Sequence, residues 1–258
     1  MLTDSHCHLD KVDLEPFQNN FASMIDAATE NDVSQFLCVC IDTEHFKDVL
    51  KPAQTYPNIH CSVGVHPTHK DSYAPTVEEL IELAMHDEVV AIGETGLDYF
   101  RCEDDDMTWQ HDLFRTHIRA AIATQKPLII HTRAAKEDTI RILREENAEK
   151  VGGVMHCFAE DWETAQKSMD LNFYISFSGI VSFNSAKELQ EVAKLVPEDR
   201  FLIETDSPWL APVPKRGRPN QPAYVKYVAE KMADLRECSY QHIAEVSTNN
   251  FNRLFKIS

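Results

Sequence analysis

The stretch Met1-Leu2-Thr3-Asp4-Ser5-His6-Cys7-His8 begins with a short possible strand and ends with two histidines. Side chains two residues apart on an extended backbone point to the same side, so His6 and His8 can converge on one metal ion. A single His-x-His pair is also typical of a polar strand end. The evidence for a metal site therefore depends on whether the same arrangement recurs along the chain. In that arrangement a strand is followed at once by metal-binding side chains.

The arrangement does recur. Four later apolar runs end abruptly in a residue that can bind a metal: 89–93 before Glu94, 127–130 before His131, 153–155 before His156, and 201–203 before Glu204-Thr205-Asp206. Continuous apolar runs bounded by polar residues are typical of strands buried on both faces, as in parallel sheets. Three further runs, at 35–40, 59–64 and 173–177, bring the predicted strands to eight.

Helical patterns fill the gaps between these runs. The clearest spans 109–124, and the others span 17–31, 77–86, 139–146, 162–170 and 186–195. Strands alternating with helices in a chain of 258 residues favour a single α/β domain, residues 1–258, folded as a (β/α)₈ TIM barrel rather than a doubly wound open sheet. Active sites of such barrels lie at the C-terminal ends of the strands, which is where the candidate metal ligands fall.

Composition agrees with one globular domain. Hydrophobic residues make up 43% of the chain, and no Gly/Ser-rich linker divides it. The amino terminus has no basic region followed by an apolar segment, and no run has the length of a membrane span, so we expect a cytoplasmic protein without a membrane partner. Seven cysteines without a CxxC pair are interpreted as reduced packing residues.

The net charge of −17 argues against non-specific wrapping of nucleic acid, because it would repel phosphates at long range. It does not exclude an enzyme that acts on nucleic acid, since bound divalent ions can invert the local field. Basic residues also occur where loops at the strand ends are predicted, at Arg101, Arg133, Lys136 and Lys215-Arg216-Gly217-Arg218. Arg133, two residues after His131, is predicted to lie in the mouth of the site.

Together the strand ends supply four histidines and two carboxylates as candidate ligands: His6, His8, His131, His156, Glu94 and Asp206. This mixture suits Zn²⁺ or Mn²⁺, and a bridging carboxylate can hold two ions about 3.5–4 Å apart. Taken singly, Glu94 could cap a helix, His156 could be a core histidine and Asp206 could cap the turn at Ser207-Pro208. The occurrence of all six at strand ends favours a dinuclear metal-dependent hydrolase.

These residues lie within longer motifs: Asp4-Ser5-His6-Cys7-His8-Leu9-Asp10, Gly64-Val65-His66-Pro67, Gly93-Glu94-Thr95-Gly96-Leu97-Asp98-Tyr99, His131-Thr132-Arg133, His156-Cys157-Phe158, Glu204-Thr205-Asp206-Ser207-Pro208-Trp209-Leu210-Ala211-Pro212 and Asn249-Asn250-Phe251. With these motifs the chain resembles, over essentially its whole length, the TatD-related deoxyribonucleases. That family is a branch of the amidohydrolase superfamily of metal-dependent (β/α)₈ barrels.

The resemblance implies how two divalent ions are shared. The first would be held by His6, His8, Glu94 and Asp206, and the second by His131 and His156 with Glu94 bridging. Mg²⁺, Zn²⁺ and Mn²⁺ are the candidate ions. The resemblance also implies a deoxyribonuclease, commonly a 3′ to 5′ exonuclease, with DNA as substrate. We expect single-stranded 3′ ends to be preferred and no obligate protein partner.

The candidate catalytic residues are Asp206, Glu94, Arg133 and His66. In the hypothesis, Asp206 takes the proton of a water activated by the two ions, while Arg133 adds a bidentate contact to the phosphate. His66, which follows the strand at 59–64, is predicted to touch the phosphate or a leaving oxygen.

Around this set, Glu204 is predicted to orient a ligand histidine. Tyr99 and Trp209 are interpreted as packing residues, with stacking on a base as the alternative. Two other functions stay open. A closed pocket would favour hydrolysis of a small amide, ester or lactone, and failure to retain metal would favour a non-catalytic scaffold.

Overall fold

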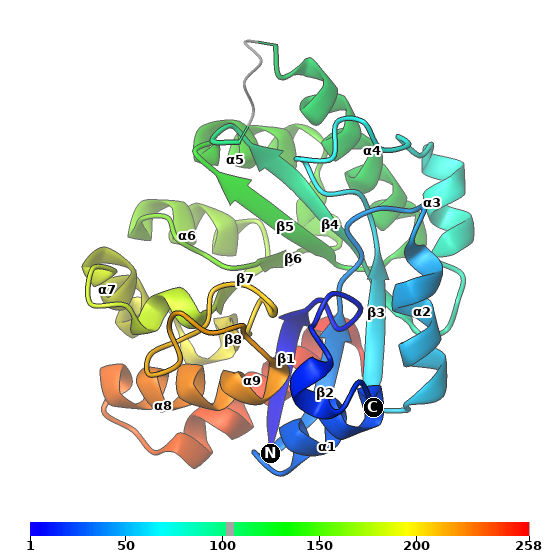
Figure 1. Ribbon diagram of the computed structural model, residues 1–258. Helices are drawn as coiled ribbons and strands as arrows, with labels where there is room; N and C mark the ends of the chain where they lie inside the picture. Colours follow the sequence, from blue (N-terminus) through cyan, green and yellow to red (C-terminus); the bar gives the residue numbers. More distant parts are fainter. Residues whose placement is uncertain (102–105, 258) are drawn as a thin grey trace.

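The computed structural model describes residues 1–101 and 106–257 and contains one sheet of eight parallel strands in the order in which they occur along the chain. The strands are β1 (Leu2–Cys7), β2 (Val33–Cys38), β3 (Ile59–Val63), β4 (Val89–Asp98), β5 (Leu128–Arg133), β6 (Gly153–Met155), β7 (Phe173–Phe177) and β8 (Phe201–Ile203). Helices surround the sheet on its outer side (Figure 1).

The sheet curves into a nearly closed barrel. Each strand pairs in parallel with the next, from β1 to β8. The segment directly after β8 reaches back to β1, where Asp206 N donates to His6 O at 2.9 Å and His8 N donates to Ser207 O at 2.8 Å. The predicted TIM barrel is therefore confirmed, and its seam closes beside candidate ligands.

The α-helices in the described part of the chain are α1 (Phe21–Thr29), α2 (Phe46–Thr55), α3 (Val77–Leu83), α4 (Thr108–Thr124), α5 (Lys136–Glu145), α6 (Trp162–Asp170), α7 (Lys187–Leu195), α8 (Val225–Arg236) and α9 (Tyr240–Phe255). Six of them match the predicted helices within a few residues at each end. The sequence patterns did not predict α2, α8 and α9.

Two of the missed helices bury apolar stripes at helical spacing, with Phe46, Val49, Leu50 and Ala53 in α2 and Val225, Val228, Ala229 and Met232 in α8. In α2, Pro52 stands inside the helix and weakens the helical signal. In α9, the buried face includes Ser247 and Asn250. The Asn250 side chain donates to Glu198 O at 2.7 Å and to Phe201 O at 2.9 Å, so it holds α9 against the start of β8 through polar contacts.

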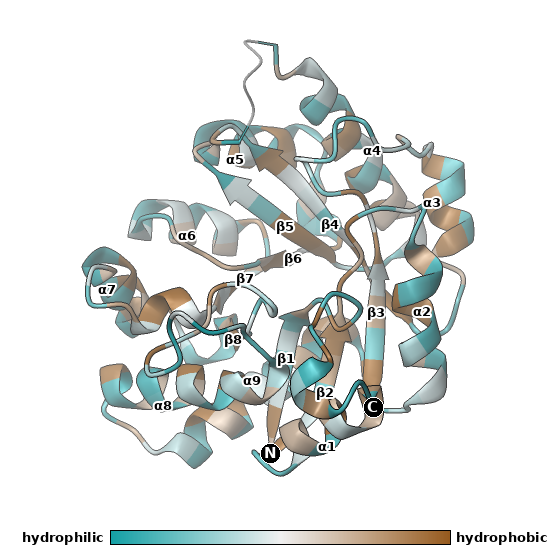
Figure 2. Cartoon of the chain, viewed as in Figure 1, coloured by the Kyte–Doolittle hydropathy of each residue, from teal (hydrophilic) through white to brown (hydrophobic). Residues whose placement is uncertain are grey.

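The core has two parts. A larger cluster fills the space between strands and helices. A smaller one combines alternate strand residues, such as Leu37, Ile129 and Leu202, with Phe251 and Phe255 of α9. Because alternate residues of a strand share one face, this cluster fills the barrel interior, and α9 supplies aromatic rings to it. The strands carry much of the apolar colouring in Figure 2.

Three strands extend further than predicted, so that His6, Glu94 and His131 lie within β1, β4 and β5. The pairing of β4 with β5 has an irregularity between Ile92 and Thr95. Gly93 in this irregularity has φ +143°, and a Cβ there would fall 2.6 Å from Ile129 O. Only glycine fits this backbone without a clash, and it places Glu94 immediately afterwards.

Two further predictions concern the cysteines and the membrane. The six cysteines in the described residues are free thiols, four of them buried, and Cys102 lies outside the described residues. Among residues 1–101 and 106–257, no helix has both the length and the apolar character that crossing a membrane requires.

Candidate metal centre

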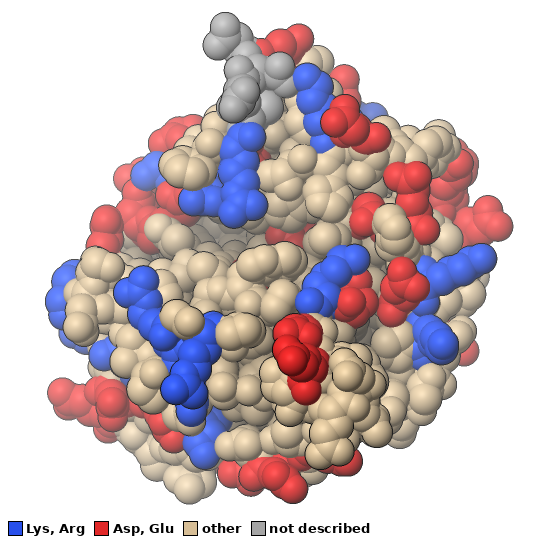
Figure 3. All heavy atoms as spheres, in the orientation of Figure 1, with Lys and Arg blue, Asp and Glu red and all other residues tan. Residues whose placement is uncertain are grey.

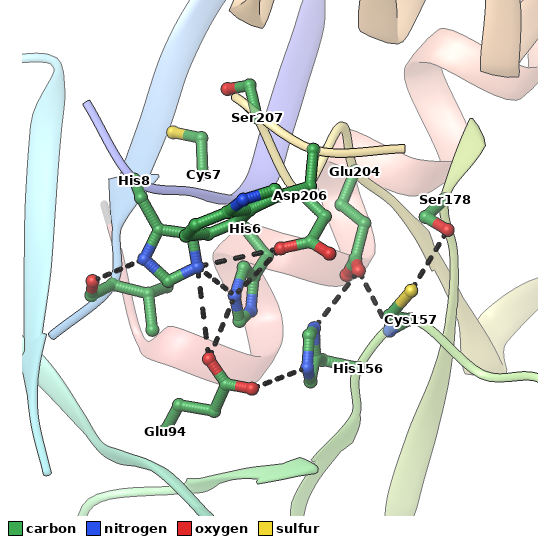
Figure 4. A network of polar contacts seen from close by, with 12 residues as sticks. His6, Cys7, His8, Glu94, His156, Cys157, Ser178, Glu204, Asp206 and Ser207 are labelled. Carbon is green, nitrogen blue, oxygen red and sulfur yellow. Dashed lines mark hydrogen bonds and ion pairs between the residues drawn. The ribbon is translucent and has the colours of Figure 1, made fainter. Parts of the chain in front are cut away.

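The six predicted ligands come together at the carboxyl ends of the strands. Figure 4 shows five of them, His6, His8, Glu94, His156 and Asp206. His6 belongs to β1, Glu94 to β4 and His131 to β5, while His8, His156 and Asp206 follow β1, β6 and β8. Most of them are buried, and the Glu94 side chain is only 3% exposed. Side chains from five strands thus meet in one buried polar cluster.

One group of donors lies beside the barrel seam. The Nε2 atoms of His6 and His8 are 3.2 Å apart. Glu94 Oε2 lies 3.4 Å from His6 Nε2 and 3.9 Å from His8 Nε2, and Asp206 Oδ1 lies 3.8 and 3.5 Å from the same two atoms. Four ligands at about 2.0–2.2 Å around a tetrahedral ion stand roughly 3.3–3.6 Å from one another. The spacing of this group therefore fits a divalent ion.

A second group faces the other oxygen of the same carboxylate. Glu94 Oε1 lies 2.8 Å from His156 Nε2 and 3.2 Å from His131 Nδ1. The His6 and His156 rings stack with centroids 3.8 Å apart, which joins the two groups. Glu94 directs one oxygen to each group, and a carboxylate in that position can bridge two ions.

Three of the histidines are held through their outer ring nitrogens. His8 Nδ1 donates to Val39 O at 3.0 Å. His156 Nδ1 lies 3.2 Å from Glu204 Oε1, and His131 Nε2 lies 3.0 Å from Asp98 Oδ2. Such contacts fix the tautomer and the ring orientation of metal-binding histidines. Glu204 thus occupies the place predicted for it, next to a candidate ligand.

The charges of the cluster are strongly coupled. Burial alone would raise the pKa of Glu94, but the nearby His156 and His66 hold it well below its usual range. Burial would lower the pKa of His156, yet Glu94 and Glu204 raise it well above its usual range. Asp206 likewise has a lowered pKa because His8 and His6 outweigh its burial. The carboxylates are ionised and attract positive charge, which a divalent ion would supply.

His66 joins the cluster from the loop after β3. Its Nε2 lies 3.2 Å from Glu94 Oε1, and its Nδ1 accepts from Thr68 N at 3.1 Å. Burial lowers the pKa of His66 to about 4. A neutral histidine whose Nδ1 is an acceptor carries its proton on Nε2. His66 therefore presents a hydrogen-bond donor, although its position beside Glu94 and His131 would also allow metal binding.

Two residues of the site were not singled out from the sequence. Asp4 accepts from Thr205 N at 2.8 Å and from Thr205 Oγ1 at 2.6 Å, and burial raises its pKa to about 8. Asp98 stands inside one of the quoted motifs and contacts His131 Nε2 through its carboxylate. The signal for Asp4 was an acid inside a buried strand, two residues before His6 and therefore on the same face.

The face of the barrel that carries the centre is hollowed near its middle (Figure 3). Lys and Arg side chains stand around this hollow, over the tip of β5, over the loop after β1 and over the loop after β8. Arg133 ends β5, Lys11 follows β1, and Lys215, Arg216 and Arg218 follow β8. Basic residues thus surround one hollow of an acidic protein, with Asp and Glu side chains among them, such as Asp10, whose Oδ2 lies 3.0 Å from Lys11 Nζ.

Similarity to known proteins covers almost the whole chain. The chain is 47% identical to the uncharacterized metal-dependent hydrolase YcfH of Escherichia coli K12, with 99% of this chain and 96% of that protein covered. It is 42% identical to the uncharacterized metal-dependent hydrolase YabD of Bacillus subtilis, with both chains covered completely.

A similar solved structure is YJJV, a TatD homologue from Escherichia coli, with a TM-score of 0.89, 25% identity and 100% and 98% of the two chains covered. Residues 3–256 match the family model described as TatD related DNase. The chain therefore belongs to the TatD-related DNase family.

Proposed function

We propose that this protein is a divalent-metal-dependent deoxyribonuclease that hydrolyses phosphodiester bonds of DNA, working from single-stranded 3′ ends. One ion would be held by His6, His8, Glu94 and Asp206, and a second by His131, His156 and Glu94. The observation that carries the proposal is Glu94, whose two oxygens face two separate groups of donors. Membership of the TatD-related DNase family and the metal-dependent hydrolases among its relatives support it.

Two bound ions in such a centre supply an activated water molecule and offset the negative charge of a phosphate. Asp206 is suited to accept the proton of that water. It is ionised, since its pKa is lowered, and its side chain is 13% exposed where that of Glu94 is 3% exposed. Of the two carboxylates, Asp206 is the one that solvent and substrate can reach.

Two further side chains are suited to bind the substrate phosphate in this proposal. His66 directs a donor into the cluster and can hydrogen-bond a phosphate or a leaving oxygen. Arg133 ends β5, two residues after His131, and no ion pair joins its guanidinium to an acid within residues 1–101 and 106–257. Its planar fork has the geometry for a bidentate contact with a phosphate. The basic residues around the hollow favour an anionic polymer over a small amide, ester or lactone.

The experiment is a time course of nucleotide release from 5′-labelled single-stranded DNA with Mg²⁺, Mn²⁺ or Zn²⁺. The wild type should give a ladder that shortens from the 3′ end. Asp206→Asn keeps the shape of the side chain but loses the base, and should be slower by about 10²–10⁴-fold. Asp26→Asn, an exposed position on α1, is the matched control and should behave as the wild type.

Near-normal turnover by Asp206→Asn would remove that residue from the mechanism. If the wild type cleaves no DNA with any of the three ions but hydrolyses a small ester or lactone, the function is that of a small-molecule hydrolase. If it binds no ion at all under these conditions, the scaffold interpretation is the correct one.

A further inference from the structure

Phe100 is a large apolar side chain held out in water beside the metal centre. It is 67% exposed and follows β4, the strand that carries Glu94. The Arg133 guanidinium lies over its ring, 3.9 Å from the centroid. One contact of the ring is therefore the cation to which the proposed function assigns the substrate phosphate, while much of the ring surface faces solvent.

The loop that carries Phe100 is fixed at several points. Asp98 accepts from Arg101 N at 2.9 Å while contacting His131, and Tyr99 N donates to Arg133 O at 3.0 Å. The Tyr99 hydroxyl donates to Asp138 Oδ2 at 2.7 Å. Tyr99 thus anchors the loop, and Phe100, rather than Tyr99, is the aromatic residue that reaches the surface. A fixed, exposed ring beside a catalytic centre is suited to bind a flat partner.

A second exposed aromatic stands across the barrel mouth. Trp209 follows β8, is 48% exposed, and packs edge-on against His8 with centroids 5.0 Å apart. Its backbone is also fixed, because Trp209 N donates to Asp206 O at 2.9 Å. In a ring of eight strands in chain order, β4 and β8 lie on opposite sides of the barrel axis. Phe100 and Trp209 therefore flank the metal centre from opposite sides.

We propose that the Phe100–Arg133 pair and Trp209 are two stacking platforms that hold nucleobases of a single-stranded polynucleotide as it crosses the barrel mouth. The inference rests on the proposed function and adds which side chains bind the bases of that substrate. Unstacked bases offer flat faces to aromatic rings irrespective of sequence, whereas bases of a duplex are already stacked on one another. A strand held on both sides would pass its backbone over the cluster.

The test uses single-stranded oligonucleotides with normal bases and the same oligonucleotides with abasic residues next to the cleaved bond. Phe100→Ala should lower kcat/KM on the normal substrate by roughly 5- to 150-fold, mainly through KM, as expected for the loss of one stacked base. Phe100→Trp should restore it. Leu195→Ala, which removes a 54% exposed side chain on α7, is the matched control and should change nothing.

The abasic substrate separates stacking from general damage to the site. The wild type should lose a similar factor on it, and Phe100→Ala should lose little more, because the partner of the ring is already absent. Equal losses on both substrates, or wild-type behaviour of Phe100→Ala on normal DNA, would overturn the platform while leaving the nuclease intact.

Binding is measured in parallel, by fluorescence anisotropy of a labelled single-stranded oligonucleotide. If the protein binds DNA in a Phe100-dependent way without cleaving it, the platform stands and the proposed function fails. If it neither binds nor cleaves DNA, both are wrong. A melting temperature of Phe100→Ala equal to that of the wild type confirms that the exposed substitution leaves the fold unchanged.

Discussion

The two groups of histidines on either side of Glu94 differ in the partners of their outer ring nitrogens. On the side of β1 and β8, the side chains of His6 and His8 are 1% and 2% exposed, and neither outer nitrogen has a carboxylate partner among the described residues. On the side of β5 and β6, carboxylates stand behind both histidines, Asp98 behind His131 and Glu204 behind His156.

The difference has an electrostatic consequence. On the seam side, burial and the neighbouring His156 lower the pKa of His6, whereas contacts with Asp206 and Glu94 outweigh burial and raise the pKa of His8. Burial also disfavours the charged form of His131, but its contacts with Asp98 and Glu94 outweigh that effect and raise its pKa. A carboxylate behind a histidine raises its basicity and its strength as a metal ligand. Behind its histidines the seam side has a backbone carbonyl and no carboxylate among the described residues, whereas the β5 and β6 side depends there on two individual acids that can be replaced.

The largest loss of metal and of turnover is expected at Glu94, the residue that contacts both groups of donors. Glu94→Gln leaves a neutral amide with one acceptor oxygen, which cannot bridge two ions. We expect metal content to fall on both sides and turnover to fall on the order of 10³-fold or more. Metal analysis after dialysis, together with the nuclease time course, measures both. Two tightly held ions per chain in this variant would contradict the bridging role, and Glu82→Gln, exposed on α3, serves as control.

An intermediate effect should separate the two sides. Glu204→Gln removes the charge behind His156, so affinity for the ion on the β5 and β6 side should fall about 10–100-fold. The seam side should keep its ion, because no hydrogen bond or ion pair among the described residues joins Glu204 to His6 or His8, and Glu204 is the last of the charges that act on the pKa of His6. Titration with metal of the chelator-treated protein should then show one site with unchanged affinity and one with weakened affinity.

The control for Glu204→Gln is a carboxylate–histidine pair far from the centre. Glu198 Oε1 lies 2.8 Å from His242 Nε2, and its side chain is 59% exposed. Glu198→Gln should leave both metal affinities unchanged. Equal weakening of the two sites by Glu204→Gln would mean that the sides are not independent.

The sequence predicted the candidate metal ligands much better than the acids that support them. The strands and the six candidate ligands were predicted because each ligand lies within a few residues of the end of a short apolar run, and parallel strands bring such ends together. The acids behind the histidines were harder to find. Glu204 is adjacent to a motif residue, but Asp98 became part of the site only because β4 continues to Asp98 and pairs there with Arg133.

Other features depend on contacts that no local pattern contains. The polar face of α9 is explained by Asn250 reaching carbonyls some fifty residues earlier in the chain. Of the two adjacent aromatics, Phe100 faces water. The Tyr99 hydroxyl is instead held by His111 of α4 and Asp138 of α5. Sequence patterns indicate which residues are buried and whether the apolar residues repeat as in a helix or a strand. The polar face of α9 and the orientation of Tyr99 depend instead on hydrogen bonds between distant parts of the chain.

The smallest effect on turnover is expected at His117, which contacts the centre only indirectly, through the backbone next to His66. His117 on α4 is completely buried, and its Nε2 accepts from Val65 N at 3.0 Å, one residue before His66. His117→Gln can make the same hydrogen bonds, so turnover at neutral pH should stay within about threefold of the wild type. The histidine and the glutamine differ in titration, because burial lowers the pKa of His117 to about 4 from 6.5.

The sign of that shift sets the direction of the pH dependence. The neutral form of His117 is the form that fits the fold, so its contribution is complete above pH 6.5 and is lost as the pH falls toward 4. Over that range the wild type should lose up to about 3 kcal/mol relative to His117→Gln, which has no proton to take up. Urea unfolding of both chelator-treated proteins from pH 7 to 4 measures the difference, in which the titration of the other histidines cancels. Parallel stability curves would show that His117 is already accessible to protons in the folded protein.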